Sequence, residues 1–570
     1  MNRWVWFTMC GLLGLLLLLC GWLIPAHLRA VEQPVLQAAG RNSASLTGRG
    51  AALAHQGQWG AAELLYRTAQ NIKLPDADQL ASTIEGAEKK YPAYRAWGVF
   101  GYGLGIRAYF PKAPRTNEAS FTDFVVREDN RKKALEVLAK SKRPAVLALL
   151  QSRALTNTTT FAPSQAPGGE AFDAAVVVTA LLVDEEKVTT NLQNEISAAA
   201  TQANQGGSSE PLEQILLDVL SLGQRFNWGQ LAMFVGKTDS ASTLHEQAEL
   251  VRNSDDQLPE LFSLVELSGD PKAVAQCLKT FPKTGMHDLT TALPYGSGGV
   301  RELLRSGHRF YTSPMRQAAS QREPLASLVA VGADYCWRMP EITLIVKWLL
   351  YFAGGFALAL ALHLGRRPAS GLEAPLQVRG FHIAREILFA LGFLLVVLLL
   401  SEPFLAQESA TTAAMPFRLR IPTAGSVIQP GSTNLKTIFM DKSKYIPMLL
   451  FFVLQGLLYI SSIVKLAEIR RQRVGPRMKL RLLENEDHLF DAGLYLGFLG
   501  TIIAFIISSV SAQHHFDLMV AYSSTSFGIL FVSVFKIFHL RPVRRKLLLE
   551  AEAEPVVAAT TAPVPSPAAP

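Results

Sequence analysis

The sequence is poor in charged residues and in cysteine. Only 18% of its 570 residues are charged and 49% are hydrophobic, with a mean hydropathy of +0.19. This composition excludes a disordered chain and indicates membrane segments combined with soluble ones. Its 4 cysteines are too few for a disulfide scaffold. Cys277 and Cys336 lie outside the apolar segments, where they either pair in an oxidising compartment or remain buried thiols.

Common catalytic motifs are also absent from the sequence. It contains no Gly-x-Ser-x-Gly, His-Glu-x-x-His, phosphate-binding loop or Cys-x-x-Cys. The glycine-rich stretch 295–299 has no strand pattern before it, so we interpret it as a turn that precedes a helix from Val300. The acidic run 184–186 is interpreted as a solvated helix face. We therefore predict that the protein is not an enzyme and binds no cofactor or metal.

Long apolar runs are the main feature that the sequence does have. A bilayer core of about 30 Å needs about 20 apolar helical residues. Six runs approach this length: Trp4–Ile24, Ile342–Leu364, Ile387–Leu405, Tyr445–Val464, Ala492–Ala512 and Leu518–Phe538. Residues 1–30 are either a signal peptide cleaved near Ala30 or an uncleaved anchor, and the length of the run favours the anchor.

Residues 31–340 show helical periodicity and almost no strand pattern. A hairpin at 51–69, with Gly57 at its turn, resembles one tetratricopeptide repeat, but no 34-residue period follows it. The other helical patterns lie at 131–152, 171–200, 211–222, 239–252, 258–267, 271–281 and 299–306. The predicted fold is therefore all-α: a polytopic membrane protein with about six transmembrane helices and a large, repeat-like helical domain.

The distribution of Lys and Arg predicts a topology. These residues gather in 364–385, in 465–481 and after the last span, whereas the turn 511–517 has none. Cytoplasmic loops are enriched in Lys and Arg, so 31–340 is predicted to be periplasmic and both termini cytoplasmic. Residues 341–410 would hold two spans, 411–444 a periplasmic loop, and 546–570 a disordered Ala/Pro-rich tail. The net charge of +8 then reflects topology, and no nucleic-acid binding is predicted.

Two short motifs stand in the last pair of apolar runs. The first is Leu496-Gly-Phe-Leu-Gly-Thr501, and the second is Ala521-Tyr-Ser-Ser-Thr-Ser-Phe-Gly528. In this order, across a short turn, they resemble the second and third core helices of the MotA/TolQ/ExbB proton channel family, with residues 445–545 as the three-helix core. Tyr522, Ser526 and Val520 depart from the family pattern.

The resemblance implies a proton-channel subunit of the bacterial inner membrane. The titrating Asp would belong to a separate single-span partner of the ExbD/TolR/MotB type, and the chain would form a homo-oligomer, a pentamer if it follows the family. Thr501 and Thr525 match the family's threonines, and Ser508 and Ser533 share their helix faces, so these four hydroxyls are the predicted proton-path residues. The predicted helix-packing residues are Gly497, Gly500 and Gly528.

A second interpretation of these hydroxyls stays open. Ser and Thr in apolar helices often bond the carbonyl four residues earlier, which needs no proton path. The protein would then be a non-conducting membrane scaffold whose periplasmic helical domain recruits partner proteins. Ionisable residues near the span ends, such as Lys347 and Glu402, are expected to reach the membrane interface.

Overall fold

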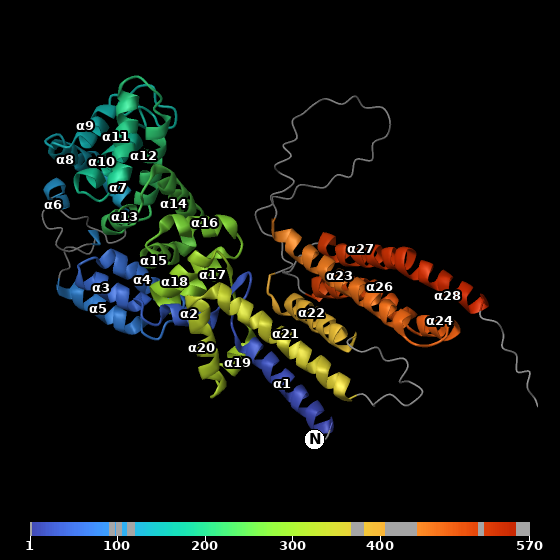
Figure 1. The fold of residues 1–570 in the computed structure, drawn as a ribbon. Coiled ribbons are helices and arrows are strands. Elements are labelled where there is room, and N and C mark those ends of the chain that lie inside the picture. Colours follow the sequence, from blue (N-terminus) through green and yellow to red (C-terminus); the bar gives the residue numbers. More distant parts are fainter. Residues whose placement is uncertain are drawn as a thin grey trace, which may run out of the picture. The chain divides into compact units, whose positions relative to one another are not determined.

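The computed structural model describes residues 3–90, 97–98, 105–110, 120–365, 381–404, 442–510 and 518–553. This part is predominantly α-helical, and its only sheet pairs the short strands β1 (Ala30–Glu32) and β2 (Arg309–Tyr311) (Figure 1). The all-α prediction is confirmed. The chain divides into two compact units, one of residues 31–314 and one of residues 1–30 together with 315–570.

The unit of residues 31–314 consists of short helices joined by tight turns. Its central helix, α10 (Glu170–Asp184), is buried from Phe172 to Val183 and so forms the core of its neighbourhood. The other helices are α2 (Gln33–Gly40), α3 (Leu46–His55), α4 (Trp59–Asn71), α5 (Ala77–Lys90), α6 (Gly105–Tyr109), α7 (Phe121–Val126), α8 (Glu128–Leu138), α9 (Pro144–Ser152), α11 (Thr190–Asn204), α12 (Glu210–Gly223), α13 (Trp228–Val235), α14 (Ala241–Asn253), α15 (Leu258–Ser268), α16 (Pro271–Thr280), α17 (Gly285–Ala292) and α18 (Gly296–Ser306).

Two local predictions in this unit have different outcomes. The hairpin at 51–69 is present as α3 and α4, and Gly57 occupies the left-handed region (φ 78°) that its turn requires. The predicted turn at 295–299 is wrong, because α18 already begins at Gly296. There the glycines permit close packing on α2: a Cβ at Gly298 would clash with the carbonyl oxygen of Ala39.

The second unit holds the long apolar helices together with short polar ones. Its helices are α1 (Arg3–Leu23), α19 (Pro314–Ala319), α20 (Leu325–Arg338), α21 (Pro340–Gly365), α22 (Phe381–Ser401), α23 (Lys442–Arg471), α24 (Pro476–Asn485), α25 (Asp487–Phe490), α26 (Ala492–Val510) and α27 (Leu518–Val534). A wider π-helical turn, Phe535–Leu540, connects α27 to α28 (Arg541–Ala553). The last helix extends into the segment 546–570 that was predicted as a disordered tail.

Four segments of the described chain are long and apolar enough to cross a membrane: Trp4–Leu23, Pro340–Gly365, Phe451–Arg471 and Tyr522–Ala553. They support a membrane protein with several spans. The remaining two predicted spans overlap α22 and α26, and both run into residues outside the described ranges. Six spans therefore remain a prediction. The loop predicted at 411–444 lies almost wholly outside the described residues.

Candidate functional site

Glycines bring α26 and α27 into close contact. A Cβ at Gly497 would lie 2.8 Å from the carbonyl oxygen of Ser524 and 3.1 Å from the Cα of Thr525. At Gly528 it would lie 2.6 Å from the carbonyl oxygen of Gly493. A side chain at either glycine would push the two backbones apart, which is the close-packing role of small residues between apolar helices.

The two predicted threonines meet in this contact. The Oγ1 atoms of Thr501 and Thr525 are 2.6 Å apart, and each lies 3.1 Å from the carbonyl oxygen of Gly497. Thr501 bonds this carbonyl within its own helix, whereas Thr525 reaches it from α27. Each hydroxyl has one hydrogen to donate and also accepts. Only the bond between the two hydroxyls can reverse its direction, because the carbonyl oxygen only accepts. When it reverses, the donor to the carbonyl of Gly497 changes from one threonine to the other without moving either side chain.

The other predicted residues are placed differently. Gly500 contacts α27 as expected, since a Cβ there would lie 2.9 Å from the Oγ of Ser524. Ser533 is exposed in the single chain and is not part of the threonine pair. Ser508 lies on α26, but its side chain is outside the described part of the structure.

Sequence reasoning missed Gln455 on α23. This side chain is 1% exposed, and its Nε2 donates to the carbonyl oxygen of Gly493, 3.0 Å away. It therefore links α23 to α26, one helical turn from the threonine pair. A single amide within an otherwise apolar span was the available signal, because buried amides need partners. Ser524, only 1% exposed, was also missed as a buried polar residue.

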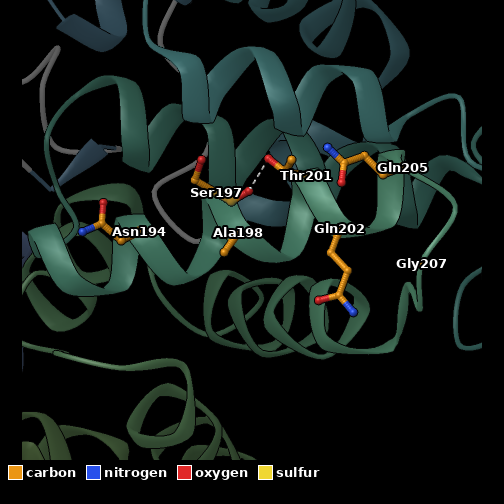
Figure 2. Close-up of a pocket in the computed structure, with 7 residues that line it drawn as sticks. All are labelled: Asn194, Ser197, Ala198, Thr201, Gln202, Gln205 and Gly207. Atoms are coloured by element: carbon orange, nitrogen blue, oxygen red, sulfur yellow. Dashed lines mark hydrogen bonds between the residues drawn. The ribbon is translucent and has the colours of Figure 1, made fainter.

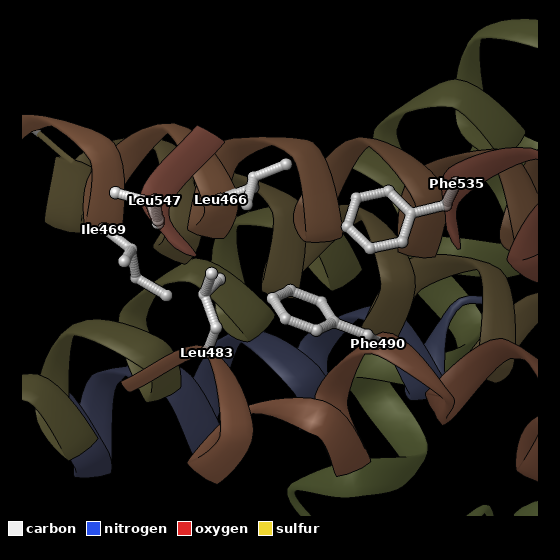
Figure 3. Close-up of a cluster of buried hydrophobic side chains, with 6 residues drawn as sticks. All are labelled: Leu466, Ile469, Leu483, Phe490, Phe535 and Leu547. Atoms are coloured by element: carbon white, nitrogen blue, oxygen red, sulfur yellow. The ribbon is translucent and has the colours of Figure 1, made fainter. Parts of the chain in front are cut away.

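Ionic and apolar contacts close one end of these helices. Lys536 Nζ lies 2.7 Å from a carboxylate oxygen of Asp491, and Tyr459 Oη lies 2.8 Å from His539 Nε2. An apolar cluster joins α23, α24, α25 and α28 with the π-helical turn (Figure 3). It consists of Leu466, Ile469, Leu483, Phe490, Phe535 and Leu547. This cluster holds the ends of α23 and α27 together through side chains outside the family-like motifs.

A second polar group ties the segment after α1 to α21 and α22. Lys347 is fully buried and donates to the carbonyl oxygen of Ala26, with its Nζ 3.9 Å from Glu402. Glu402 also accepts from the backbone amide of Leu28 at 2.8 Å and lies 3.5 Å from His27. We call Lys347, Glu402 and His27 the Lys347 cluster. The expectation that Lys347 and Glu402 extend to an interface is wrong in this structure, because both are enclosed by neighbouring helices.

The helical unit 31–314 has polar groups with structural partners. Glu213, completely buried, accepts hydrogen bonds from Ser209 and from the backbone amides of residues 159–161. Burial opposes its ionisation, but these hydrogen bonds outweigh that effect and hold the pKa of Glu213 below its usual range.

In the acidic run 184–186, Asp184 accepts hydrogen bonds from Tyr109 and Ser141, so this residue is not simply part of a solvated helix face. Cys277 is a free thiol, and burial raises its pKa to about 11.

The same unit has an open hollow of about 630 Å³ along α11 (Figure 2). Its lining residues are Asn194, Ser197, Ala198, Thr201, Gln202, Gln205 and Gly207. Thr201 donates to the carbonyl oxygen of Ser197, as the dashed line shows. No lining residue is titratable near neutral pH, and the described residues contain no group of three or more metal-ligating side chains. The hollow therefore offers no acid–base or metal chemistry.

Comparison with protein-family models, with curated proteins and with solved structures finds no match for this chain.

Proposed function

We propose that this protein is a proton-channel subunit of the bacterial inner membrane, similar to MotA, TolQ and ExbB. The observation that supports it is the threonine pair, which joins the two residues singled out by the motifs in one hydrogen-bonded group between α26 and α27. Proton transfer needs polar groups at membrane depth, and hydroxyls supply them without the cost of a buried charge.

The proposal includes a partner and an orientation. An Asp-bearing, single-span partner of the ExbD/TolR/MotB type would carry the titrating group, and copies of this chain would assemble around it, as a pentamer if family-like. Residues 31–340 would be periplasmic and the C-terminus cytoplasmic. Proton motive force, about 2.3 kcal/mol per charge per 100 mV, would drive an envelope process. No enzymatic activity is proposed.

The scaffold remains the second candidate because one observation favours it. Thr501 donates to the carbonyl of Gly497, four residues earlier in its own helix, and Thr525 bonds both Thr501 and the same carbonyl. Hydrogen bonds of this kind also pack helices without conducting protons. Under this alternative the helical unit would recruit partner proteins, and the apolar helices would only anchor it.

Proton flux in proteoliposomes separates the two candidates. The protein is reconstituted with a single-span, Asp-bearing partner, and wild type is compared with Thr501→Ala and Thr525→Val. Ser526→Ala is the matched control, because Ser526 is exposed on α27 and bonds only the carbonyl of Tyr522 among the described contacts. The channel predicts partner-dependent flux that drops at least about tenfold in the two threonine variants and not in the control. A stable complex without flux in any form supports the scaffold.

A further inference from the structure

Gln455 has an unpaired acceptor in a buried place. Its Nε2 bonds the carbonyl of Gly493, but its Oε1 is buried and has no hydrogen-bond partner within the described residues. Leaving a buried amide oxygen without a partner is costly, so such groups usually bond a protein donor or an ordered water.

The surrounding backbone is shaped around this amide. A Cβ on Gly493 would lie 2.9 Å from Oε1, and one on Gly528 would lie 3.3 Å from Nε2. The amide of Gln455 thus occupies a slot between a glycine of α26 and a glycine of α27. An apolar side chain of the same length would fill the slot equally well, so packing alone does not account for the amide.

The slot lies on the same face of α26 as the threonine pair. Gly493, Gly497 and Thr501 follow one another at four-residue spacing, which places them on one stripe. The carbonyls of Gly493 and Gly497 each accept a side-chain bond from a neighbouring helix, from Gln455 and from Thr525 respectively. These carbonyls are about 6 Å apart along the axis, about the length of two hydrogen bonds in series.

An ion pair lies at the end of α26 beyond Gly493. Asp491, the residue before α26 begins, is paired with Lys536 of the π-helical turn. Along the axis of α26, the threonine pair, the amide of Gln455 and this ion pair therefore follow one another, although Asp491 does not share the face of Gly493.

We propose that Oε1 of Gln455 binds a water molecule, and that this water extends the polar stripe of the threonine pair toward the end of α26 where Asp491 and Lys536 form an ion pair. Water donates to Oε1 while its oxygen accepts a proton from one side and releases another to the opposite side, so the water is regenerated. The presence of the water stands on the geometry alone, whereas its part in proton transfer rests on the proposed function.

The water is tested without reference to flux. Gln455→Leu keeps similar volume and removes the amide, and Ser462→Ala is the control, since Ser462 is buried on α23 and bonds Leu458 of its own helix. Radicals produced by an X-ray pulse in ¹⁸O-water label side chains next to bound waters. Val532, which would contact a Cβ on Gly493 at 3.1 Å, is the reporter. Labelling of Val532 should fall in Gln455→Leu and stay at the wild-type level in Ser462→Ala; equal labelling in all three overturns the water.

Flux then tests the role of the water. Partner-dependent proton flux should drop about tenfold in Gln455→Leu and remain unchanged in Ser462→Ala. If labelling of Val532 falls in Gln455→Leu but flux is unchanged, the water is bound at Gln455 but takes no part in proton transfer. Absence of flux in the wild type refutes the proposed function, and the labelling result still decides the water. The thermal unfolding midpoint verifies folding, with Gln455→Met as the substitute if the leucine variant does not fold.

Discussion

Removing the amine of Lys347 should destabilise the second unit strongly. In Lys347→Met the side chain keeps its length, but Glu402 loses the ammonium group 3.9 Å away and the carbonyl of Ala26 loses its donor. Lys347 is 0% exposed and the Glu402 side chain is 2% exposed, so solvent screens neither group. A buried carboxylate without its partner destabilises the fold more than a buried pair does. The free energy of unfolding of the variant should therefore fall by more than the attraction between the two groups alone.

The magnitude follows from the geometry. Two charges 3.9 Å apart attract by about 4 kcal/mol at an effective dielectric constant of about 20. Measured losses on removing one member of a buried pair are about 3–5 kcal/mol. The amide of Leu28 and the ring of His27 still face Glu402 and limit the loss, so we expect about 3 kcal/mol in the free energy of unfolding.

A double-mutant cycle measures this coupling. Unfolding of the detergent-solubilised protein by SDS is compared for wild type, Lys347→Met, Glu402→Gln and the double variant. The double variant should recover at least about half of the loss, because no unpaired charge remains. Ile345→Met, on the exposed side of α21, is the control and should change stability by less than about 0.5 kcal/mol. A single variant as stable as the control, or a double variant no better than the sum of the singles, would refute the reasoning.

Two further variants test the helical unit and the α26–α27 contact. Glu213→Gln should lower the unfolding free energy at pH 7 by about 2 kcal/mol, because the amide cannot accept all the hydrogen bonds from Ser209 and the loop amides. Because folding lowers the pKa of Glu213, its contribution to stability is present above the unfolded pKa and is lost as pH falls through the folded pKa. The difference in melting temperature between pH 7 and pH 3 should therefore be smaller in the variant than in wild type. An equal difference contradicts this prediction. Gly497→Ala should lower the melting temperature, because its Cβ would lie 2.8 Å from the carbonyl of Ser524. Gly86→Ala, with nothing within 4 Å, should instead gain about 0.5–1 kcal/mol, and a similar gain at Gly497 would show that the helices do not touch there.

The Lys347 cluster also bears on the first apolar helix. Cleavage near Ala30 would remove the backbone groups of Ala26 and Leu28 and the ring of His27, which are partners of Lys347 and Glu402 in the structure. This favours the anchor over a cleaved signal peptide. N-terminal sequencing of the protein from membranes is the direct check, and a chain that starts after Ala30 would contradict it.

The sequence by itself determined the helical class, the apolar segments and the pairing of the two motifs. Hydrophobic periodicity and the length of apolar runs indicate whether a helix has one apolar face or is apolar all round. Periodicity and run length are both local properties of the chain. The glycines and threonines of α26 and α27 were also accessible to sequence reasoning, because their spacing fixes which residues share a face.

Only the tertiary structure decided which polar groups are buried and which groups are their hydrogen-bond or ionic partners. Lys347 and Glu402 are 55 residues apart in the sequence, and Gln455 and Gly493 are 38 apart, so no local pattern relates them. A lysine near a span end extends to water or becomes enclosed according to the helices that pack around it. The same holds for Gln455, whose slot exists only because glycines of two other helices lie opposite it. Burial depends on contacts between distant segments, and that dependence is the physical reason why these residues emerged only from the folded chain.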